Sequence, residues 1–278
     1  MPLSPILVVG PLYTGSERGL AADLLTARGL GLAPLAVCTQ LVVASGGVVT
    51  DVTDVPVDTV VAQLEHTLGL GTPVAAKVGG LASAATAAAV LDSLVAFEGP
   101  VVLDVVASGP SGETVMNAAG IDAVAERLSV ADLVTISKAD AELVTGGQIE
   151  SLDDAQVAAQ RLHHRGARRV VIRCGTLPYR FYDAAEDPGG DGAEASALSF
   201  DLYYDGEDFA LFEASRIDVD AGDGLSSVFA ITVLSVLIET DSFEDSLQAA
   251  KRNATDAVRG SHSATAFGRR VAYPVPQP

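Results

Sequence analysis

Short runs of Val, Ile and Leu alternate along the chain with longer segments that are rich in Ala and Leu. The apolar runs lie at residues 5–10, 32–44, 73–81, 99–107, 132–138 and 168–175. Continuous apolar runs of this length are typical of strands that are buried on both faces of a parallel sheet. The segments between them have helical length, and repeated strand–helix order places helices on both faces of the sheet. The sequence therefore predicts an α/β fold with a doubly wound, mostly parallel sheet.

The strand–helix alternation then stops. Residues 198–215 hold two runs rich in aromatic residues that are joined through Asp205 and Gly206, a pattern that predicts a β-hairpin. A loop rich in Gly and Asp at 186–196 precedes them, and two C-terminal helices follow. Because no linker divides the chain, we expect residues 1–278 to form one domain, with the hairpin near one edge of the sheet.

The charge of the chain restricts its partners. It carries 36 acidic and 17 basic residues, a formal net charge of −19, which repels nucleic acids and anionic membranes. No apolar stretch approaches the roughly 20 residues of a membrane span, and the first residues lack the basic region of a signal peptide. Cys38 and Cys174 lie in apolar strand segments without CxxC spacing and are expected to be reduced, buried thiols. We therefore expect a cytoplasmic protein whose partner is a small molecule.

The predicted sheet indicates where a ligand binds. In open α/β sheets, ligands bind beyond the carboxyl ends of the strands. The residues that end or follow a predicted strand are Gly10, Gly79, Asp104, Ser137 and Gly175. Lys77 also ends a strand, and it either faces this rim or pairs with an acid. Lys138 is placed to approach nucleotide phosphates, so the rim is the predicted ligand site.

Three carboxylates are expected at the same rim. Asp104 ends one strand, Asp140 follows the next, and Asp223 stands at the start of a C-terminal helix. Together they could hold Mg²⁺ through water or include a catalytic base. Each one alone could instead be a helix cap. As a set on one rim, they favour a functional site.

Residues 221–224 read Ala-Gly-Asp-Gly and lead into a long apolar helix. Small residues let the backbone turn closely, and the free N–H groups at a helix start would stabilise a phosphoryl group in transfer. Asp223, in the same turn, can accept the proton of an attacking alcohol. The chain has no GxxxxGK[ST] loop, which excludes a P-loop enzyme. The loop therefore predicts phosphoryl transfer of another kind.

Several segments resemble one known family. They read ILVVG and TGSERGLAADLLTARGLG near the start, KVGGL and VVLDVVASGPSGETVM in the middle, and LVTISKADAELVTG after them. In order and spacing they are similar to the ribokinase-like superfamily, and within it to the hydroxymethylpyrimidine phosphate kinases of thiamine biosynthesis, with pyridoxal kinases as neighbours. The resemblance implies ATP- and Mg²⁺-dependent phosphorylation of a small heteroaromatic alcohol, namely a hydroxymethylpyrimidine or its monophosphate. Relatives are often dimers, which makes a homodimer the expectation.

The resemblance also implies roles for individual residues. Asp223 takes the catalytic position, and Ala221 and Gly222 complete an anion hole. Asp140 and Asp104 take the metal-associated positions. The residues on the nucleotide side are Ser137, Lys138, Arg173, Gly175 and Thr176. The residues on the substrate side are Gly10, Leu12, Ala44, Gly79, Gly80 and Asp104.

The chain departs from the family pattern at informative positions. Asp220 replaces the first glycine of the anion-hole motif. Ala44 replaces the glutamine that recognises the aminopyrimidine ring in the family, and Leu12 replaces an aspartate. Loss of a buried polar side chain that hydrogen-bonds to the substrate removes roughly 1–3 kcal/mol from the difference in binding free energy between substrates. Two alternatives therefore stay open. Asp223, where the pyrimidine kinases usually have Cys, resembles pyridoxal kinases, and Asp220 is consistent with a non-catalytic ligand-binding or sensor protein.

Overall fold

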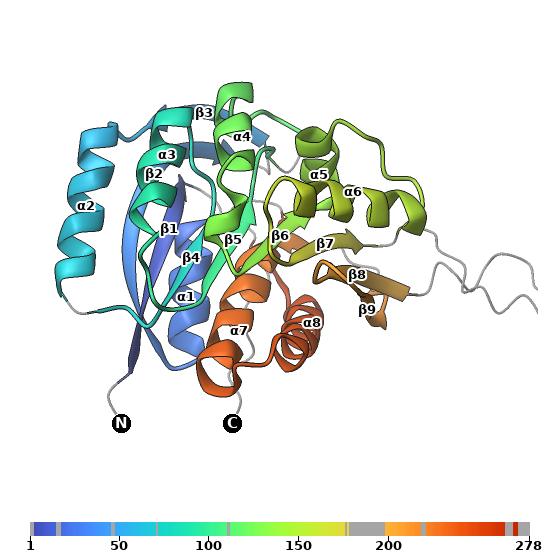
Figure 1. The fold of residues 1–278 in the computed structure, drawn as a ribbon. Coiled ribbons are helices and arrows are strands. Elements are labelled where there is room, and N and C mark those ends of the chain that lie inside the picture. Colours follow the sequence, from blue (N-terminus) through green and yellow to red (C-terminus); the bar gives the residue numbers. More distant parts are fainter. Residues whose placement is uncertain are drawn as a thin grey trace, which may run out of the picture.

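The computed structural model describes residues 3–14, 18–45, 48–70, 72–109, 112–175, 177, 198–217, 221–264 and 269–271. The strands of its main sheet are β1 (Ser4–Thr14), β2 (Leu32–Ser45), β3 (Val48–Asp54), β4 (Ala75–Val78), β5 (Val101–Val105), β6 (Leu133–Ser137), β7 (Val170–Gly175), β8 (Leu198–Tyr204) and β9 (Phe209–Ser215). They form one nine-stranded sheet in the order β3-β2-β1-β4-β5-β6-β7-β8-β9 (Figure 1).

The central strands run parallel, and both edges of the sheet are antiparallel. Strands β2, β1, β4, β5, β6 and β7 pair in parallel. β3 pairs antiparallel with β2 at one edge, and the β8–β9 hairpin pairs antiparallel with β7 at the other. The predicted fold is therefore confirmed. β1 is longer than the predicted 5–10 because, after a register shift at Gly10, it continues beside β2 to Thr14.

Helices cover both faces of the sheet (Figure 1). One layer contains α2 (Val57–Leu70), α3 (Ala84–Ser93), α4 (Ala118–Ala125), α5 (Lys138–Thr145) and α6 (Leu152–His164). The other layer contains α1 (Leu20–Gly29), α7 (Leu225–Thr240) and α8 (Phe243–Arg259). A 3-10 turn, Leu128–Val130, follows α4. In the part of the chain that the structure describes, no helix is long and apolar enough to cross a bilayer.

Successive residues of β1 point into different apolar layers. Leu7 and Val9 belong to the core on the side of α2 to α6, whereas Ile6 and Val8 belong to the core on the side of α1, α7 and α8. All four side chains are fully buried. Side chains alternate between the two faces of a strand, so a strand covered on both faces is apolar at every position. This double burial explains the continuous apolar runs of the sequence.

A second, three-stranded sheet lies at the start of α7. β10 (Ala221–Asp223) pairs in parallel with β12 (Arg269–Val271), which pairs antiparallel with β11 (His262–Ala264). The segment expected as a loop before α7 therefore contains a short strand. Its pairing holds the backbone that leads into α7 against residues near the C-terminal end of the chain.

Both cysteines are free thiols, and Cys38 is less buried than expected. Cys38 on β2 is half-buried, and Cys174 on β7 is buried. Burial is the main cause that raises the pKa of the Cys174 thiol to about 12. Because the thiolate is the reactive form, Cys174 should stay unmodified by a thiol reagent at pH 8 in the folded protein and react after unfolding in urea. Thiol titration of wild type and Cys174→Ser measures this, and rapid loss of two thiols in the folded wild type would contradict it.

Candidate functional site

A small cavity opens near the carboxyl ends of β1, β4 and β5. Its volume is about 80 Å³. The residues that line it are Pro11, Tyr13, Arg18, Gly19, Lys77, Gly79, Gly80, Asp104, Val106, Ser108, Gly224, Ser226 and Ser227. The cavity thus brings together strand ends from the N-terminal half of the chain and the first turn of α7.

Asp223 lies directly before α7. Its side chain is 4% exposed. Gly224, the N-cap of α7, follows with a left-handed φ of 87° and has no side chain that could cap the helix. The first N–H groups of a helix have no partner within it, so an uncapped helix end binds anions. Asp223 therefore places a buried carboxylate beside an anion-binding helix end.

Asp223 forms an ion pair with Arg18. Nε of Arg18 donates to Oδ1 of Asp223 at 2.6 Å, and Nη2 of Arg18 contacts the same oxygen. The two residues are 205 positions apart in the chain, and Arg18 immediately precedes the turn into α1. Sequence reasoning did not predict this contact. The signal available was one basic residue within the glycine-rich segment TGSERG.

Tyr13, rather than Leu12, lines the cavity. Neighbouring side chains alternate across a strand, and Leu12 on the opposite face is 38% exposed. Ala44 is buried in a small cluster with Tyr13 and Val42 and does not line the cavity. Burial raises the pKa of Tyr13, although the charge of Arg18 opposes this rise. Neither of the two altered substrate positions, Leu12 and Ala44, therefore lines the cavity, whereas Tyr13 does.

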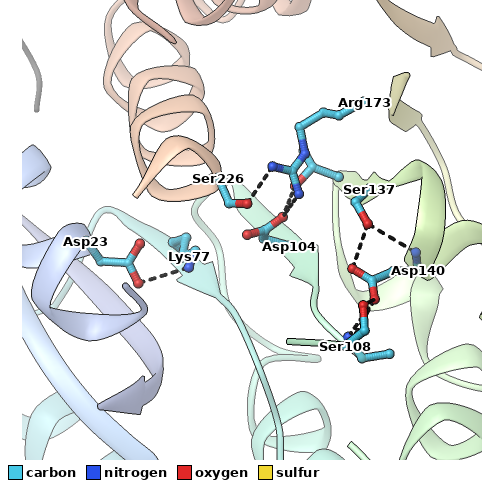
Figure 2. A network of polar contacts seen from close by, with 10 residues as sticks. Asp23, Lys77, Asp104, Ser108, Ser137, Asp140, Arg173 and Ser226 are labelled. Atoms are coloured by element: carbon cyan, nitrogen blue, oxygen red, sulfur yellow. Dashed lines mark hydrogen bonds and ion pairs between the residues drawn. The ribbon is translucent and has the colours of Figure 1, made fainter. Parts of the chain in front are cut away.

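A network of polar side chains joins the strand ends to α7 (Figure 2). Asp104 on β5 accepts hydrogen bonds from Oγ1 of Thr135 on β6 at 2.9 Å and from Nη2 of Arg173 on β7 at 3.1 Å. Nη1 of Arg173 donates to Oγ of Ser226 in the first turn of α7 at 2.5 Å. The Nε–H group of Arg173 is buried and has no hydrogen-bond partner among the residues that the structure describes. Arg173 therefore anchors the start of α7 to the sheet and keeps one donor for a further acceptor.

Asp140 has both carboxylate oxygens engaged (Figure 2). Oδ1 accepts from the N–H groups of Ala107 and Ser108 at 3.2 and 2.9 Å and from the hydroxyl of Ser108 at 2.7 Å. Oδ2 accepts from the hydroxyl of Ser137 at 2.8 Å. Ser137 is the N-cap of α5, and its Oγ accepts from the N–H group of Asp140. Asp140 therefore clamps the start of α5 to the loop that follows β5.

The carboxylates assigned to Mg²⁺ do not fit as its direct ligands. Asp140 has donors on both oxygens, and Oδ1 of Asp104 already accepts two hydrogen bonds. Across the residues that the structure describes, no group of three or more His, Cys, Asp or Glu side chains is arranged to hold a metal ion. Asp140 and Asp104 would therefore meet Mg²⁺ through water, as the sequence analysis expects, and this assignment stays a prediction.

The other assigned residues are spread along the rim. Gly10 and Gly79 lie side by side, and the N–H group of Gly79 donates to the carbonyl of Val9 at 2.7 Å. Nζ of Lys138 pairs with Glu142 at 2.9 Å, one turn further along α5. The rest of the assigned or singled-out positions are Gly80 in the cavity wall, Gly175 with a left-handed φ of 63° at the end of β7, and Ala221 and Gly222 in β10. Thr176 and Asp220 lie outside the described residues.

Lys77 lines the cavity and also pairs with an acid, so both alternatives left open by the sequence hold. Its Nζ lies 2.9 Å from Oδ2 of Asp23 on α1, and the two side chains are 3% and 0% exposed. Burial raises the pKa of Asp23, and the positive charge of Lys77 opposes that rise. The pair therefore neutralises a carboxylate that would otherwise be isolated beneath the cavity floor.

Comparisons with known proteins cover nearly the whole chain. A sequence model of the phosphomethylpyrimidine kinase family matches residues 14–274. A hydroxymethylpyrimidine/phosphomethylpyrimidine kinase of Aquifex aeolicus is 26% identical over 245 residues, which cover 87% of this chain and 89% of that protein. The thiamine biosynthesis bifunctional protein ThiED of Geobacter sulfurreducens is 30% identical over 260 residues, 93% of this chain and 50% of that protein. The pyridoxal kinase from Staphylococcus aureus in complex with AMP-PCP superposes with a TM-score of 0.80 at 25% identity, covering 99% of this chain and 93% of that one.

The Lys77–Asp23 pair generates a stability prediction. Lys77→Met leaves the Asp23 carboxylate buried without its cation, which should lower the free energy of unfolding by about 3–5 kcal/mol. Because the pKa of Asp23 is raised in the folded protein, this loss should shrink as the pH falls and the carboxylate takes up a proton.

Urea unfolding at pH 7 measures the effect. Lys138→Met is the matched control, because its ion pair with Glu142 has the same 2.9 Å length but is partly exposed, and its loss should cost about 0.5 kcal/mol or less. Asp23→Asn combined with Lys77→Met should regain much of the lost stability. Equal losses in the two Lys→Met variants would contradict the prediction.

Proposed function

Since the chain belongs to the phosphomethylpyrimidine kinase family, we propose that it transfers the terminal phosphoryl group of ATP to the hydroxymethyl group of a hydroxymethylpyrimidine or of its monophosphate. The observation that carries this proposal is the position of Asp223, a buried carboxylate directly before the uncapped end of α7 at the cavity. A base beside an anion-binding site is what phosphoryl transfer to an alcohol requires.

In the proposed reaction, Asp223 accepts the proton of the acceptor's hydroxymethyl group. The alcohol oxygen forms a bond to the terminal phosphorus of ATP. The bond between that phosphorus and the bridging oxygen breaks, and its electron pair leaves with ADP. The N–H groups at the start of α7 stabilise the negative charge of the phosphoryl group during transfer.

Arg173 supports the nucleotide side of the site. It fixes Ser226 of α7 relative to Asp104 of the sheet, and its Nε–H group, which has no partner among the described residues, would have to become exposed to donate to a phosphate oxygen. The solved pyridoxal kinase with a TM-score of 0.80 holds AMP-PCP, an analogue of ATP, which favours ATP as the donor. Mg²⁺ that accompanies ATP would take its direct ligands from phosphates and water, and Asp104 and Asp140 would contact it through that water.

Pyridoxal is the second candidate acceptor. The S. aureus protein whose fold this chain shares is a pyridoxal kinase, and Asp223 stands where the pyrimidine kinases usually carry Cys. The non-catalytic alternative depended on Asp220, which lies outside the described residues. Release of ADP with each acceptor decides between the two kinases, and binding of an acceptor without ADP release would favour the sensor. The single domain, the homodimer and the cytoplasmic location stay predictions.

Asp223→Asn tests the role of the base. The amide removes the proton acceptor at nearly constant shape, so turnover should fall by about 10²- to 10⁴-fold. Binding of the acceptor, measured by calorimetry, should remain. Asp153→Asn is the matched control because Asp153 is an exposed residue in the first turn of α6. Turnover that is unchanged in Asp223→Asn would overturn the assignment.

A further inference from the structure

Arg18 lies where the proposed reaction would take place. Its guanidinium contacts Oδ1 of Asp223, and its side chain lines the same cavity as Gly224 and Ser226 at the start of α7. The side chain is 20% exposed, so most of it is withdrawn from water. A guanidinium stays charged at any pH at which the protein is folded. A permanent cation therefore contacts the proposed base and lines the cavity at the anion-binding helix end.

The backbone next to Arg18 is fixed against β1. Gly19 has a left-handed φ of 54°, and a Cβ at this position would lie 2.2 Å from the carbonyl oxygen of Pro11. Gly19 also forms an antiparallel bridge with Leu12. A side chain larger than hydrogen is thus excluded here, and the close approach directs Arg18 toward the cavity. The pairing of Arg18 with Asp223 is built into this part of the fold.

The present arrangement leaves little room for reactants. Cavities that take small molecules usually measure about 300–1,000 Å³. This cavity holds about 80 Å³, and Arg18 forms part of its wall. Arg18 contacts Oδ1 of Asp223 and narrows the cavity, so we expect the guanidinium to move when an acceptor is seated against this carboxylate. A phosphoryl group at the start of α7 would offer it a new partner, because the planar fork of arginine matches phosphate oxygens.

We propose that Arg18 exchanges Asp223 for the terminal phosphoryl group of the nucleotide, and so acts as a catalytic residue. The exchange frees the carboxylate to accept the proton and places a positive charge on the group in transfer. Arg18 forms no covalent bond, and the bonds made and broken are those of the proposed kinase reaction, on which this inference rests. An arginine supplied to a transferring phosphoryl group can raise kcat by about 10³- to 10⁵-fold.

Nucleotide binding tests the exchange without any acceptor. AMP-PCP carries the third phosphate that Arg18 would contact, and ADP lacks it. In Arg18→Met, the dissociation constant for AMP-PCP should rise about tenfold, the size expected for one lost charge-assisted contact, while that for ADP changes less than about twofold. Arg28→Met, an exposed arginine in the last turn of α1, is the charge-matched control and should change neither constant.

Asp223→Asn should have an effect on AMP-PCP binding opposite to that of Arg18→Met. It removes the carboxylate that competes with phosphate for Arg18, so AMP-PCP should bind more tightly than to wild type while ADP binding stays the same. The double variant Arg18→Met/Asp223→Asn should lose this gain. The double variant leaves neither charge unpaired. It therefore still tests the role of Arg18 if circular dichroism shows that Arg18→Met alone does not fold. Arg18→Lys, which keeps the charge but not the fork, should fall between wild type and Arg18→Met.

The outcomes separate the two proposals. Wild type that binds neither nucleotide would overturn the proposed kinase function and the role of Arg18 with it. Wild type that binds both, with the same ratio of AMP-PCP to ADP affinity in Arg18→Met, would overturn the role of Arg18 and leave the kinase function standing. If Arg18 only stabilised the backbone next to Gly19, Arg18→Met would weaken the binding of AMP-PCP and ADP equally. This result would also overturn the proposed exchange.

Discussion

The parallel strands are buried on both faces, and the arrangement of every polar group near the sheet depends on this burial. A charged side chain inside such a strand has no water and needs a partner of opposite charge or hydrogen-bond donors. Lys77 on β4 meets Asp23 on α1, and Asp104 on β5 meets Arg173 on β7. Each partner comes from a different element. The burial of the strands thus produces polar contacts that tie the helices to the strand ends.

These contacts also shape the cavity. Arg173 bonds to both Ser226 and Asp104, so the N-terminal end of α7 is held at a defined distance from the sheet (Figure 2). The β10–β12 pairing holds the backbone on the other side of Asp223. A helix end that is to receive a phosphate without moving needs this support, since a preorganised donor costs no rearrangement when charge develops. The contacts that hold the start of α7 therefore lie at the same place as the proposed phosphoryl transfer.

Carboxylates that are alike in the sequence have different surroundings in the structure. Asp140 accepts hydrogen bonds from neutral donors on both oxygens, whereas Asp223 contacts the guanidinium of Arg18 beside the cavity. Periodicity could place Asp104, Asp140 and Asp223 near the ends of elements. It could not say which donors face them, because Ser108, Arg173 and Arg18 approach from other elements. For this reason the sequence could propose a metal site but not the contacts of its carboxylates; the metal site stays a prediction, and Asp104 does line the cavity.

The sequence by itself determined the mostly parallel sheet, the edge hairpin and the rim that holds the cavity, because burial on two faces leaves a local pattern of apolar residues. The tertiary structure alone decided which side chains enter that cavity. Alternation along β1 places Tyr13 at the cavity and Leu12 on the other face, and only the packing of β1 shows which face is which. Arg18 meets Asp223 across 205 positions. Neither contact leaves a local pattern, since each depends on how distant segments pack together.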